Sequence, residues 1–335
     1  MKNITDKLNR PIKDLRISVM DTCNYRCPYC MPADKFDDNY QFLKPQQRLS
    51  FDEIYQIVKI FAKFGVNKIR LTGGEPLLRK NLAELITKIK QIDGIKDIAL
   101  TTNGQLLKKQ LPQLIDAGLD RINISLDTVD KDLYYQMSGN KGQLHTVLDA
   151  IDFARQSTLK SIKLNCVVQI GVNEDQILPL LEKYQNTEVV VRFIEFMDVG
   201  NKNGWQQKNV LHFTDILKII ESKWPLKSLT PNYKGEVASR YKYTDHDGEI
   251  GFITSISQPF CRDCSRARLS ADGKLYTCLF ANKSFDLRHY IRNGNLENLE
   301  QFIQNTWQNR DDRYSETRHK NETTHDKIEM YVIGG

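Results

Sequence analysis

Three cysteines, Cys23, Cys27 and Cys30, lie within eight residues, directly after the apolar segment 15–20. A loop that follows a strand can fold three such thiolates around one face of an iron-sulfur cube, whose fourth iron then has no protein ligand. A structural zinc site needs a fourth sulfur or nitrogen nearby, and no His, Cys, Asp or Glu follows until Asp34. The spacing therefore favours an iron-sulfur cluster with an open, reactive iron over zinc.

The other cysteines of the seven in the chain bear on this interpretation. A second group near the C-terminal end consists of Cys261, Cys264 and Cys278. Two sets of three thiols predict two clusters, each with an open iron. The alternative is one closed four-sulfur zinc site made of Cys27, Cys30, Cys261 and Cys264. That site would leave Cys23 and Cys278 without a role.

The seventh cysteine, Cys166, lies in the apolar segment 164–168 and is expected to be a small buried hydrophobic residue. Disulfides are not expected, because the polar segment 1–7 lacks the apolar core of a secretion signal. No segment approaches the roughly 18 consecutive apolar residues of a membrane span. We therefore expect a soluble, cytoplasmic protein with reduced thiols.

The 335-residue chain carries 48 Lys and Arg against 42 Asp and Glu, a formal excess of +6. This excess suits an anionic partner without indicating nucleic acid. A chain of this length can contain one barrel-sized domain with an appendage, or two medium-sized domains.

Six short segments rich in Ile and Val predict strands. They are residues 15–20, 68–72, 97–102, 121–126, 162–169 and 189–197. Between them, apolar residues recur with the i, i+3, i+4, i+7 spacing of a helix with one buried face, as in segment 54–61. The first of these helices has Ser50 and Glu53 as a capping box and Gly65 as a left-handed C-terminal residue.

This alternation of strands and helices predicts a parallel sheet with right-handed crossovers. Six units are two fewer than a complete eight-fold barrel, so the sheet is closed in part or open and doubly wound. In either architecture ligands bind at the carboxyl ends of the strands, and polar residues gather there in this chain. They lie at 72–76, 101–104, 125–127 and 195–197.

The pattern changes after about residue 200. A helix is predicted at 214–222, followed by short strands at 251–255 and 267–270. We place a domain boundary near residue 225, so that residues 1–225 and 226–335 form two domains.

The sequence Gly73-Gly74-Glu75-Pro76 follows the second predicted strand. Glycine lets a ligand approach the main chain, so free N–H and C=O groups are expected to bind the amino and carboxylate groups of an amino acid held at the open iron. Together with the Cys-x3-Cys-x2-Cys loop and its aromatic Tyr29, this motif resembles the radical S-adenosylmethionine (SAM) enzymes. The resemblance implies an α/β fold: an incomplete (βα)6 TIM-like barrel with a C-terminal α+β extension that carries a second iron-sulfur cluster.

In that superfamily, SAM chelates the open iron. An electron from the cluster cleaves SAM to methionine and a 5′-deoxyadenosyl radical, and this radical abstracts a hydrogen from the substrate. The cofactor supplies this chemistry, and the protein aims the radical. The resemblance implies that Cys23, Cys27 and Cys30 hold the radical-generating 4Fe–4S cluster. It also implies SAM contacts from Tyr29, Gly74, Ser125 and Met197.

Within the superfamily, the second cysteine group and the terminal Gly334-Gly335 make the whole chain similar to the GTP 3′,8-cyclase family. That family catalyses the first step of molybdenum cofactor biosynthesis. The radical takes the C3′ hydrogen of GTP, and the ribose radical attacks C8 of guanine to give (8S)-3′,8-cyclo-7,8-dihydroguanosine 5′-triphosphate. The resemblance implies a second 4Fe–4S cluster, which binds the purine through its open iron and is held by Cys261, Cys264 and Cys278. Gly334 and Gly335 would reach into the active site.

Seven residues match family positions that contact GTP: Arg16, Arg70, Thr101, Lys163, Arg192, Arg266 and Arg268. A triphosphate bears about four negative charges, and Arg forms bidentate, charge-assisted hydrogen bonds to phosphate oxygens. The family resemblance further implies a flavodoxin- or ferredoxin-type electron donor, a homodimer, and transfer of the product to cyclic pyranopterin monophosphate synthase.

Two alternatives stay open. One is a radical SAM peptide maturase whose C-terminal cysteines hold auxiliary clusters. The other is a zinc-stabilised nucleic-acid-binding protein, motivated by the positive charge and the two Cys-x2-Cys pairs, although the chain has no recognisable groove-reading element. The polar segments 310–313 and 316–325 are predicted to form a solvated helix or linker.

Overall fold

The computed structural model describes residues 3–318 and 327–334, in which the strands form one twelve-stranded sheet. Each of the six segments predicted as strands forms one, with small shifts at the ends. They are β1 (Asp14–Ser18), β2 (Lys68–Thr72), β3 (Asp97–Thr102), β4 (Arg121–Ser125), β5 (Ser161–Val168) and β6 (Val190–Glu195). Each runs parallel to the next, which confirms the predicted parallel α/β sheet.

Strands from the C-terminal part of the chain extend this sheet on both sides. β9 (Glu249–Ile253) runs parallel beside β6, and β10 (Arg266–Leu269) runs parallel beside β1. Antiparallel strands follow on each side: β8 (Ser239–Tyr243) and β7 (Leu226–Leu229), and β11 (Lys274–Tyr276) and β12 (Phe285–Asp286). Among the described strands the order runs from β12 to β7 without closing, so the barrel is incomplete. The domain boundary near residue 225 stays a prediction.

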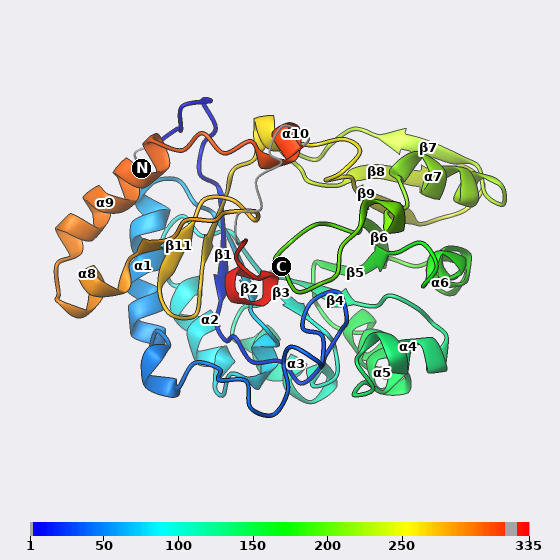
Figure 1. Cartoon of the computed structure of the whole chain (residues 1–335), viewed down its shortest axis with the longest axis horizontal. Coiled ribbons are helices and arrows are strands. Elements are labelled where there is room, and N and C mark those ends of the chain that lie inside the picture. Colours follow the sequence, from blue (N-terminus) through cyan, green and yellow to red (C-terminus); the bar gives the residue numbers. More distant parts are fainter. Residues whose placement is uncertain (1–2, 319–326, 335) are drawn as a thin grey trace.

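Helices connect the parallel strands and lie around the outside of the sheet (Figure 1). Those between β1 and β6 are α1 (Phe51–Lys63), α2 (Leu82–Lys90), α3 (Leu107–Asp116), α4 (Lys131–Met137), α5 (Leu144–Arg155) and α6 (Ile177–Tyr184). The capping box of α1 is confirmed: the Ser50 hydroxyl accepts from the Glu53 N–H at 3.1 Å, and the Glu53 carboxylate accepts from the Ser50 N–H at 2.6 Å. Gly65 follows with a φ of +100°, as predicted.

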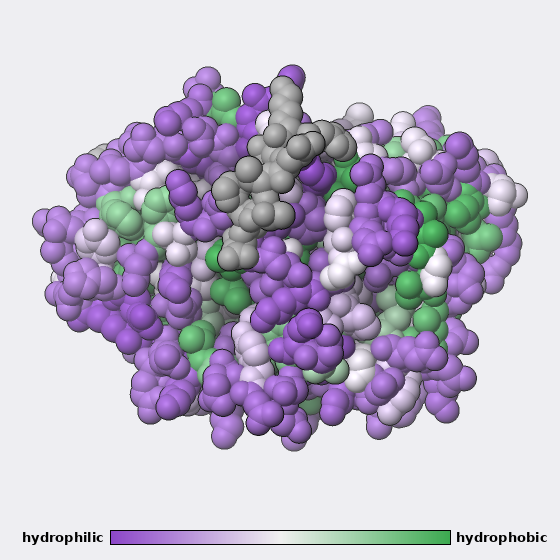
Figure 2. Space-filling model, viewed as in Figure 1, coloured by the Kyte–Doolittle hydropathy of each residue, from purple (hydrophilic) through white to green (hydrophobic). Residues whose placement is uncertain are grey.

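The remaining helices lie in the C-terminal part of the chain. They are α7 (Phe213–Glu221), α8 (Arg288–Arg292), α9 (Leu296–Gln308), α10 (Tyr314–Thr317) and α11 (Met330–Ile333). Short 3-10 helices occur at Pro45–Gln47, Pro76–Leu78, Glu174–Gln176, Gln207–Asn209 and Cys261–Asp263. In the described parts of the chain, no helix is long and apolar enough to cross a membrane. Hydrophilic residues cover most of the face shown in Figure 2.

Alternation along the strands separates the core from the inner face of the sheet. On β5, Cys166 belongs to the buried face and is 1% exposed, which confirms it as a small core residue, whereas Lys163 and Asn165 line a cavity. On β1, Leu15 is buried in the core and Arg16 lines the same cavity. The sheet thus packs against helices on one face and presents polar side chains on the other.

Candidate active site

One cavity extends along the inner face of the sheet from the first cysteine group to the second. Every strand from β1 to β6 contributes to its wall, as do β9 and β10. The wall contains every predicted cluster cysteine and every predicted SAM and GTP residue, namely Cys23, Cys27, Tyr29, Cys30, Arg16, Arg70, Gly74, Thr101, Ser125, Lys163, Arg192, Met197, Cys261, Cys264, Arg266, Arg268 and Cys278. The structure brings these residues together, and their individual ligand roles stay predictions.

The first cysteine group lies in the loop after β1, with all three thiols partly buried. Burial, followed by the charge of Glu75, raises the pKa of Cys23 to about 12. Burial and the neighbouring thiolates raise the pKa of Cys27 and Cys30 well above the usual range. Deprotonation of three thiols this close together therefore requires a compensating positive charge, which the iron atoms of a cluster would supply. The first cysteine group therefore fits an iron-sulfur cluster.

The Gly-Gly-Glu-Pro motif packs directly on the chain that leads into the first cysteine group. A Cβ on Gly73 would collide with the carbonyl oxygen of Met20, and one on Gly74 with that of Thr22. The Gly74 N–H donates to Met20 O at 2.7 Å, and the Glu75 N–H donates to Thr22 O at 2.9 Å. The N–H groups of Gly74 and Glu75 are therefore not free for a ligand, because the neighbouring segment already binds them, and the predicted role of the other backbone groups of the motif stays a prediction. Contact between Gly74 and SAM stays a prediction.

The buried carboxylate of Glu75 joins the loops that follow β2 and β3. It accepts hydrogen bonds from the Thr102 hydroxyl at 2.7 Å, the Asn103 N–H at 2.8 Å and the Leu77 N–H at 3.0 Å. Burial raises the pKa of Glu75 to about 7, although the hydrogen bonds favour the charged form. Glu75 therefore positions the loops around the first cysteine group.

Tyr29 connects the cysteine loop to the middle of the sheet. Its hydroxyl donates to the carboxylate of Asp127 at 2.7 Å, and the other Asp127 oxygen accepts from the Val167 N–H at 2.8 Å. Burial raises the pKa of Asp127 to about 6. The sequence places Asp127 among the polar residues at the strand ends but gives it no individual ligand role.

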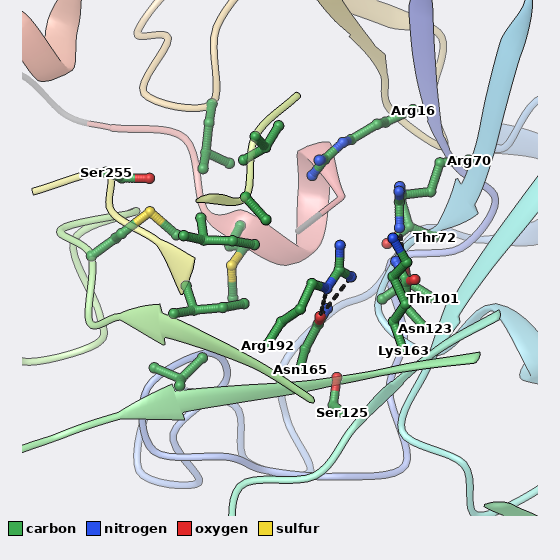
Figure 3. A pocket seen from close by; sticks show the side chains of 18 of the residues that line it. Arg16, Arg70, Thr72, Thr101, Asn123, Ser125, Lys163, Asn165, Arg192 and Ser255 are labelled. Carbon is green, nitrogen blue, oxygen red and sulfur yellow. Dashed lines mark hydrogen bonds between the residues drawn. The ribbon is translucent and has the colours of Figure 1, made fainter. Parts of the chain in front are cut away.

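Cationic side chains from β1, β2, β5 and β6 point into one region of the cavity (Figure 3). They are Arg16, Arg70, Lys163 and Arg192. Burial, followed by the charge of Arg192, lowers the pKa of Lys163 to about 8. Burial, followed by the charges of Arg268 and Arg70, lowers the pKa of Arg16 well below its usual range. These shifts show that the cations are crowded and poorly solvated, so an anionic ligand would stabilise them.

Two of these cations are oriented by neutral partners. Arg192 donates to Asn165 Oδ1 through Nε at 3.0 Å and through Nη2 at 2.7 Å (Figure 3), and Arg70 donates to Thr101 Oγ1 at 3.2 Å. Neutral partners fix the guanidinium groups without cancelling their charge. Asn165 is not among the residues predicted from the sequence, and its only signal is a polar residue on the inward-facing side of a strand. The arrangement suits a polyanion such as a triphosphate.

The second cysteine group lies in the chain between β9 and β12, and all three of its cysteines line the cavity. Burial raises the pKa of Cys278 to about 12. At Cys264 the charges of Arg266 and Arg310 outweigh burial and lower the pKa to about 7. This group therefore contains a thiol that is readily present as the metal-binding thiolate.

Within the described residues, no three His, Cys, Asp or Glu side chains lie close enough together to hold a single metal ion. This finding disfavours the pooled zinc site. The thiols of a cluster bind different iron atoms and need not converge on one point. Both cysteine groups therefore remain compatible with clusters.

Arg310 is the exception to the prediction that segment 310–313 is solvated, since Asp311 and Arg313 are exposed. Arg310 is 4% exposed and forms an ion pair with Asp6 at 3.1 Å. Asp6 also pairs with Arg10 at 2.6 Å. Local sequence carries no signal for this burial, because the partner carboxylate is 304 residues away along the chain.

The C-terminal tail lies against the same cavity. Helix α11 contacts β1 and is near the centre of the molecule in Figure 1. Arg268 donates a hydrogen bond to the carbonyl oxygen of Gly334, and a Cβ on Gly334 would collide with the Thr72 side chain. Gly334 thus touches two residues of the cavity wall, whereas Gly335 lies outside the described residues. The predicted catalytic importance of both glycines stays a prediction.

Comparison with known proteins agrees with this geometry. Residues 17–184 match the radical SAM superfamily, and residues 189–316 match the family described as Molybdenum Cofactor Synthesis C. The chain is 50% identical over 330 residues to a GTP 3′,8-cyclase of Xanthomonas axonopodis pv. citri (strain 306), with 98% of both chains covered. It is 48% identical over 340 residues to that of Staphylococcus aureus (strain Mu3), with both chains covered completely. This chain belongs to the GTP 3′,8-cyclase family.

Family membership confirms the resemblance drawn from the cysteine motifs and identifies the chain as a radical SAM enzyme. Among solved structures, Streptococcus suis SuiB bound to S-adenosylmethionine matches with a TM-score of 0.65 at 15% identity, over 95% of this chain and 70% of that one. At this identity the likeness concerns the fold alone. It confirms the incomplete barrel.

Proposed function

We propose that this chain converts GTP to (8S)-3′,8-cyclo-7,8-dihydroguanosine 5′-triphosphate, the first step of molybdenum cofactor biosynthesis. Relatives that carry the GTP 3′,8-cyclase name over their full length support the reaction. The observation that carries the proposal at the level of the site is the set of partly buried cations that line one cavity together with both cysteine groups. Such a set is costly without an anion, and a nucleoside triphosphate supplies one.

Two 4Fe–4S clusters belong to this site, one held by Cys23, Cys27 and Cys30 and the other by Cys261, Cys264 and Cys278. When SAM is bound at the first cluster, the pair supplies a 5′-deoxyadenosyl radical able to abstract the C3′ hydrogen of the ribose. The residues that bind and orient SAM are Tyr29, Gly74, Ser125 and Met197. The hydrogen bond from Tyr29 to Asp127 supports a fixed orientation of that ring.

GTP is bound by Arg16, Arg70, Thr101, Lys163, Arg192, Arg266 and Arg268. Because Asn165 already orients Arg192 and Thr101 already contacts Arg70, these two side chains lose little freedom when they bind phosphate. Partial burial of the cations lowers the local polarity and strengthens their interaction with the ligand. The tail near Gly334 covers the site beside Arg268.

Further assignments rest on family membership. The electron donor is of flavodoxin or ferredoxin type, the product passes to cyclic pyranopterin monophosphate synthase, and the chain forms a homodimer in the cytoplasm. The seven unpaired cysteines support a reducing compartment.

The direct test is anaerobic. The chain is reconstituted with iron and sulfide, supplied with dithionite and SAM, and assayed for 5′-deoxyadenosine with GTP, with ATP and without nucleotide. We expect GTP alone to stimulate cleavage and to be consumed into a cyclised product. Cleavage that ignores GTP would indicate another substrate, such as a peptide. No cleavage in a preparation with both clusters loaded would overturn the radical assignment.

The variant Cys278→Ser separates the roles of the two cysteine groups. We expect SAM cleavage to stay detectable while the cyclised product disappears. Cys166→Ser is the matched control, because Cys166 lies in the core of the sheet. Undiminished product in Cys278→Ser would refute the role of the second group.

A further inference from the structure

A buried ion-pair network lies behind the second cysteine group and joins distant parts of the chain. Its members are Asp6, Arg10 and Arg310, which are 5%, 2% and 4% exposed. The Asp6 carboxylate accepts from Arg10 Nε at 2.6 Å and from Arg310 Nη1 at 3.1 Å. One buried carboxylate therefore fixes two guanidinium groups.

Both arginines bind backbone carbonyls of the cysteine segments. Arg10 Nη1 donates to Cys261 O at 2.7 Å. Arg310 donates to Cys264 O at 2.8 Å and to the carbonyl of Thr277, which precedes the third cysteine, at 3.0 Å. The network thus holds the backbone at all three cysteines of the group.

Arg310 differs from Arg10 because it also contacts a thiol. Its Nη2 donates to Cys264 Sγ at 3.3 Å. The guanidinium lies 4.6 Å from the centre of the Trp307 ring and pairs with Asp312 at 3.3 Å. With the carbonyl contacts, these neighbours fix the guanidinium, so the N–H···S hydrogen bond is held in place by the fold.

We propose that Arg310 is a positioning residue that also tunes the second cluster. Its charge-assisted hydrogen bond draws negative charge from the Cys264 sulfur, which stabilises the reduced cluster and raises its reduction potential. The same effect makes the open iron a stronger Lewis acid, so that it binds a nitrogen or oxygen atom of the nucleotide more tightly. This inference rests on the proposed assignment of Cys261, Cys264 and Cys278 as cluster ligands.

The test uses the full chain with Cys23, Cys27 and Cys30 all changed to Ser, so that only the second cluster forms. In this background Arg310→Gln is compared with Arg10→Gln. Arg10 is the matched control because it is equally buried in the same network and binds a cysteine carbonyl. The readouts are iron per chain and the midpoint potential in a redox titration followed by electron paramagnetic resonance. The potential belongs to the loaded molecules, so partial loading does not obscure it.

We expect Arg310→Gln to shift the midpoint potential to a more negative value. Arg10→Gln should lower the iron loading without shifting the potential. Arg310→Lys keeps a positive charge and should show a smaller negative shift than Arg310→Gln. Loss of iron in Arg310→Gln but not in Arg10→Gln would also support a special role of the thiol contact. An unchanged potential in Arg310→Gln, an equal shift in Arg10→Gln, or complete loss of iron in both overturns the inference. If the background binds no iron with both arginines intact, the proposed ligand assignment fails, and this inference with it.

Discussion

The guanidinium group of Arg268 donates a hydrogen bond to the carbonyl oxygen of Gly334. Arg268 lies on β10 and lines the cavity, and burial, followed by the charge of Arg266, lowers its pKa to about 10. A single side chain therefore connects the C-terminal tail to the group of cations proposed to bind GTP. Any displacement of the tail changes the hydrogen bonds of a substrate-facing arginine.

Gly334→Ala tests this connection. Gly334 has a φ of +73°, and an added Cβ would collide with the Thr72 side chain, so the tail must move. The left-handed backbone alone costs an L-residue roughly 1–2 kcal/mol. We expect cyclised product to fall at least about tenfold while SAM cleavage continues. Gly204→Ala is the control, because Gly204 has a φ of +63° but nothing within 4 Å of its added Cβ. Equal losses at both positions would contradict a specific role of the tail.

The charge of Lys163 predicts a pH dependence of GTP binding. Burial, followed by Arg192, lowers its pKa to about 8, so Lys163 is protonated below that pH and neutral above it. A bound triphosphate favours the ammonium form, and binding above this pKa therefore takes up a proton. We expect the Kd for GTP to rise by up to about tenfold per pH unit above pH 8 and to stay nearly constant below it. Lys163→Arg keeps its charge and should flatten the profile in anaerobic titrations, and an unchanged profile in this variant would assign the effect to another group.

Glu75→Gln is expected to destabilise the fold. Both Glu75 oxygens accept hydrogen bonds, and the Gln amide would place an N–H group against a donor such as the Asn103 N–H. An unsatisfied buried donor costs roughly 1–3 kcal/mol in the free energy of unfolding. Urea unfolding of the apoprotein measures this change in the free energy of unfolding. Glu84→Gln is the control, because Glu84 is exposed. Similar midpoints for both variants would show that Glu75 does not position these loops.

Asp198 binds three side chains that are close in sequence to the C-terminal tail. It accepts from the Tyr314 hydroxyl at 2.5 Å, the Lys327 ammonium at 2.7 Å and the Arg318 guanidinium at 3.1 Å. We expect Asp198→Asn to speed amide hydrogen exchange in α11 about tenfold or more while β1 to β6 stay protected. Asp215→Asn serves as control, because Asp215 is half-exposed and pairs only with Lys218 among the described ion pairs. Unaltered exchange in α11 would mean that the tail is held by its other contacts alone.

Features of the fold with a local signal are predictable from the sequence. The Ile- and Val-rich segments and the helical patterns between them predicted the parallel sheet, and strand ends predicted where polar residues would meet. Burial and hydrogen bonding that depend on a distant partner are not predictable in this way. Arg310 lies in a charged segment of a kind that is usually exposed to solvent. It is buried because it forms an ion pair with Asp6, near the other end of the chain. The occupied N–H groups of Gly74 and Glu75 were likewise not predictable, because the carbonyls of Met20 and Thr22 meet them only in the folded sheet.

The pairing of β10 with β1 has a consequence for synthesis on the ribosome. Consecutive βα units can assemble as they emerge from the ribosome. One edge of β1, however, stays unpaired until β10 has been synthesised, because Arg16 of β1 pairs with Arg268 of β10. An exposed strand edge invites pairing with other chains. The nascent protein is therefore most vulnerable to aggregation late in translation, and the first cysteine loop is formed well before the second.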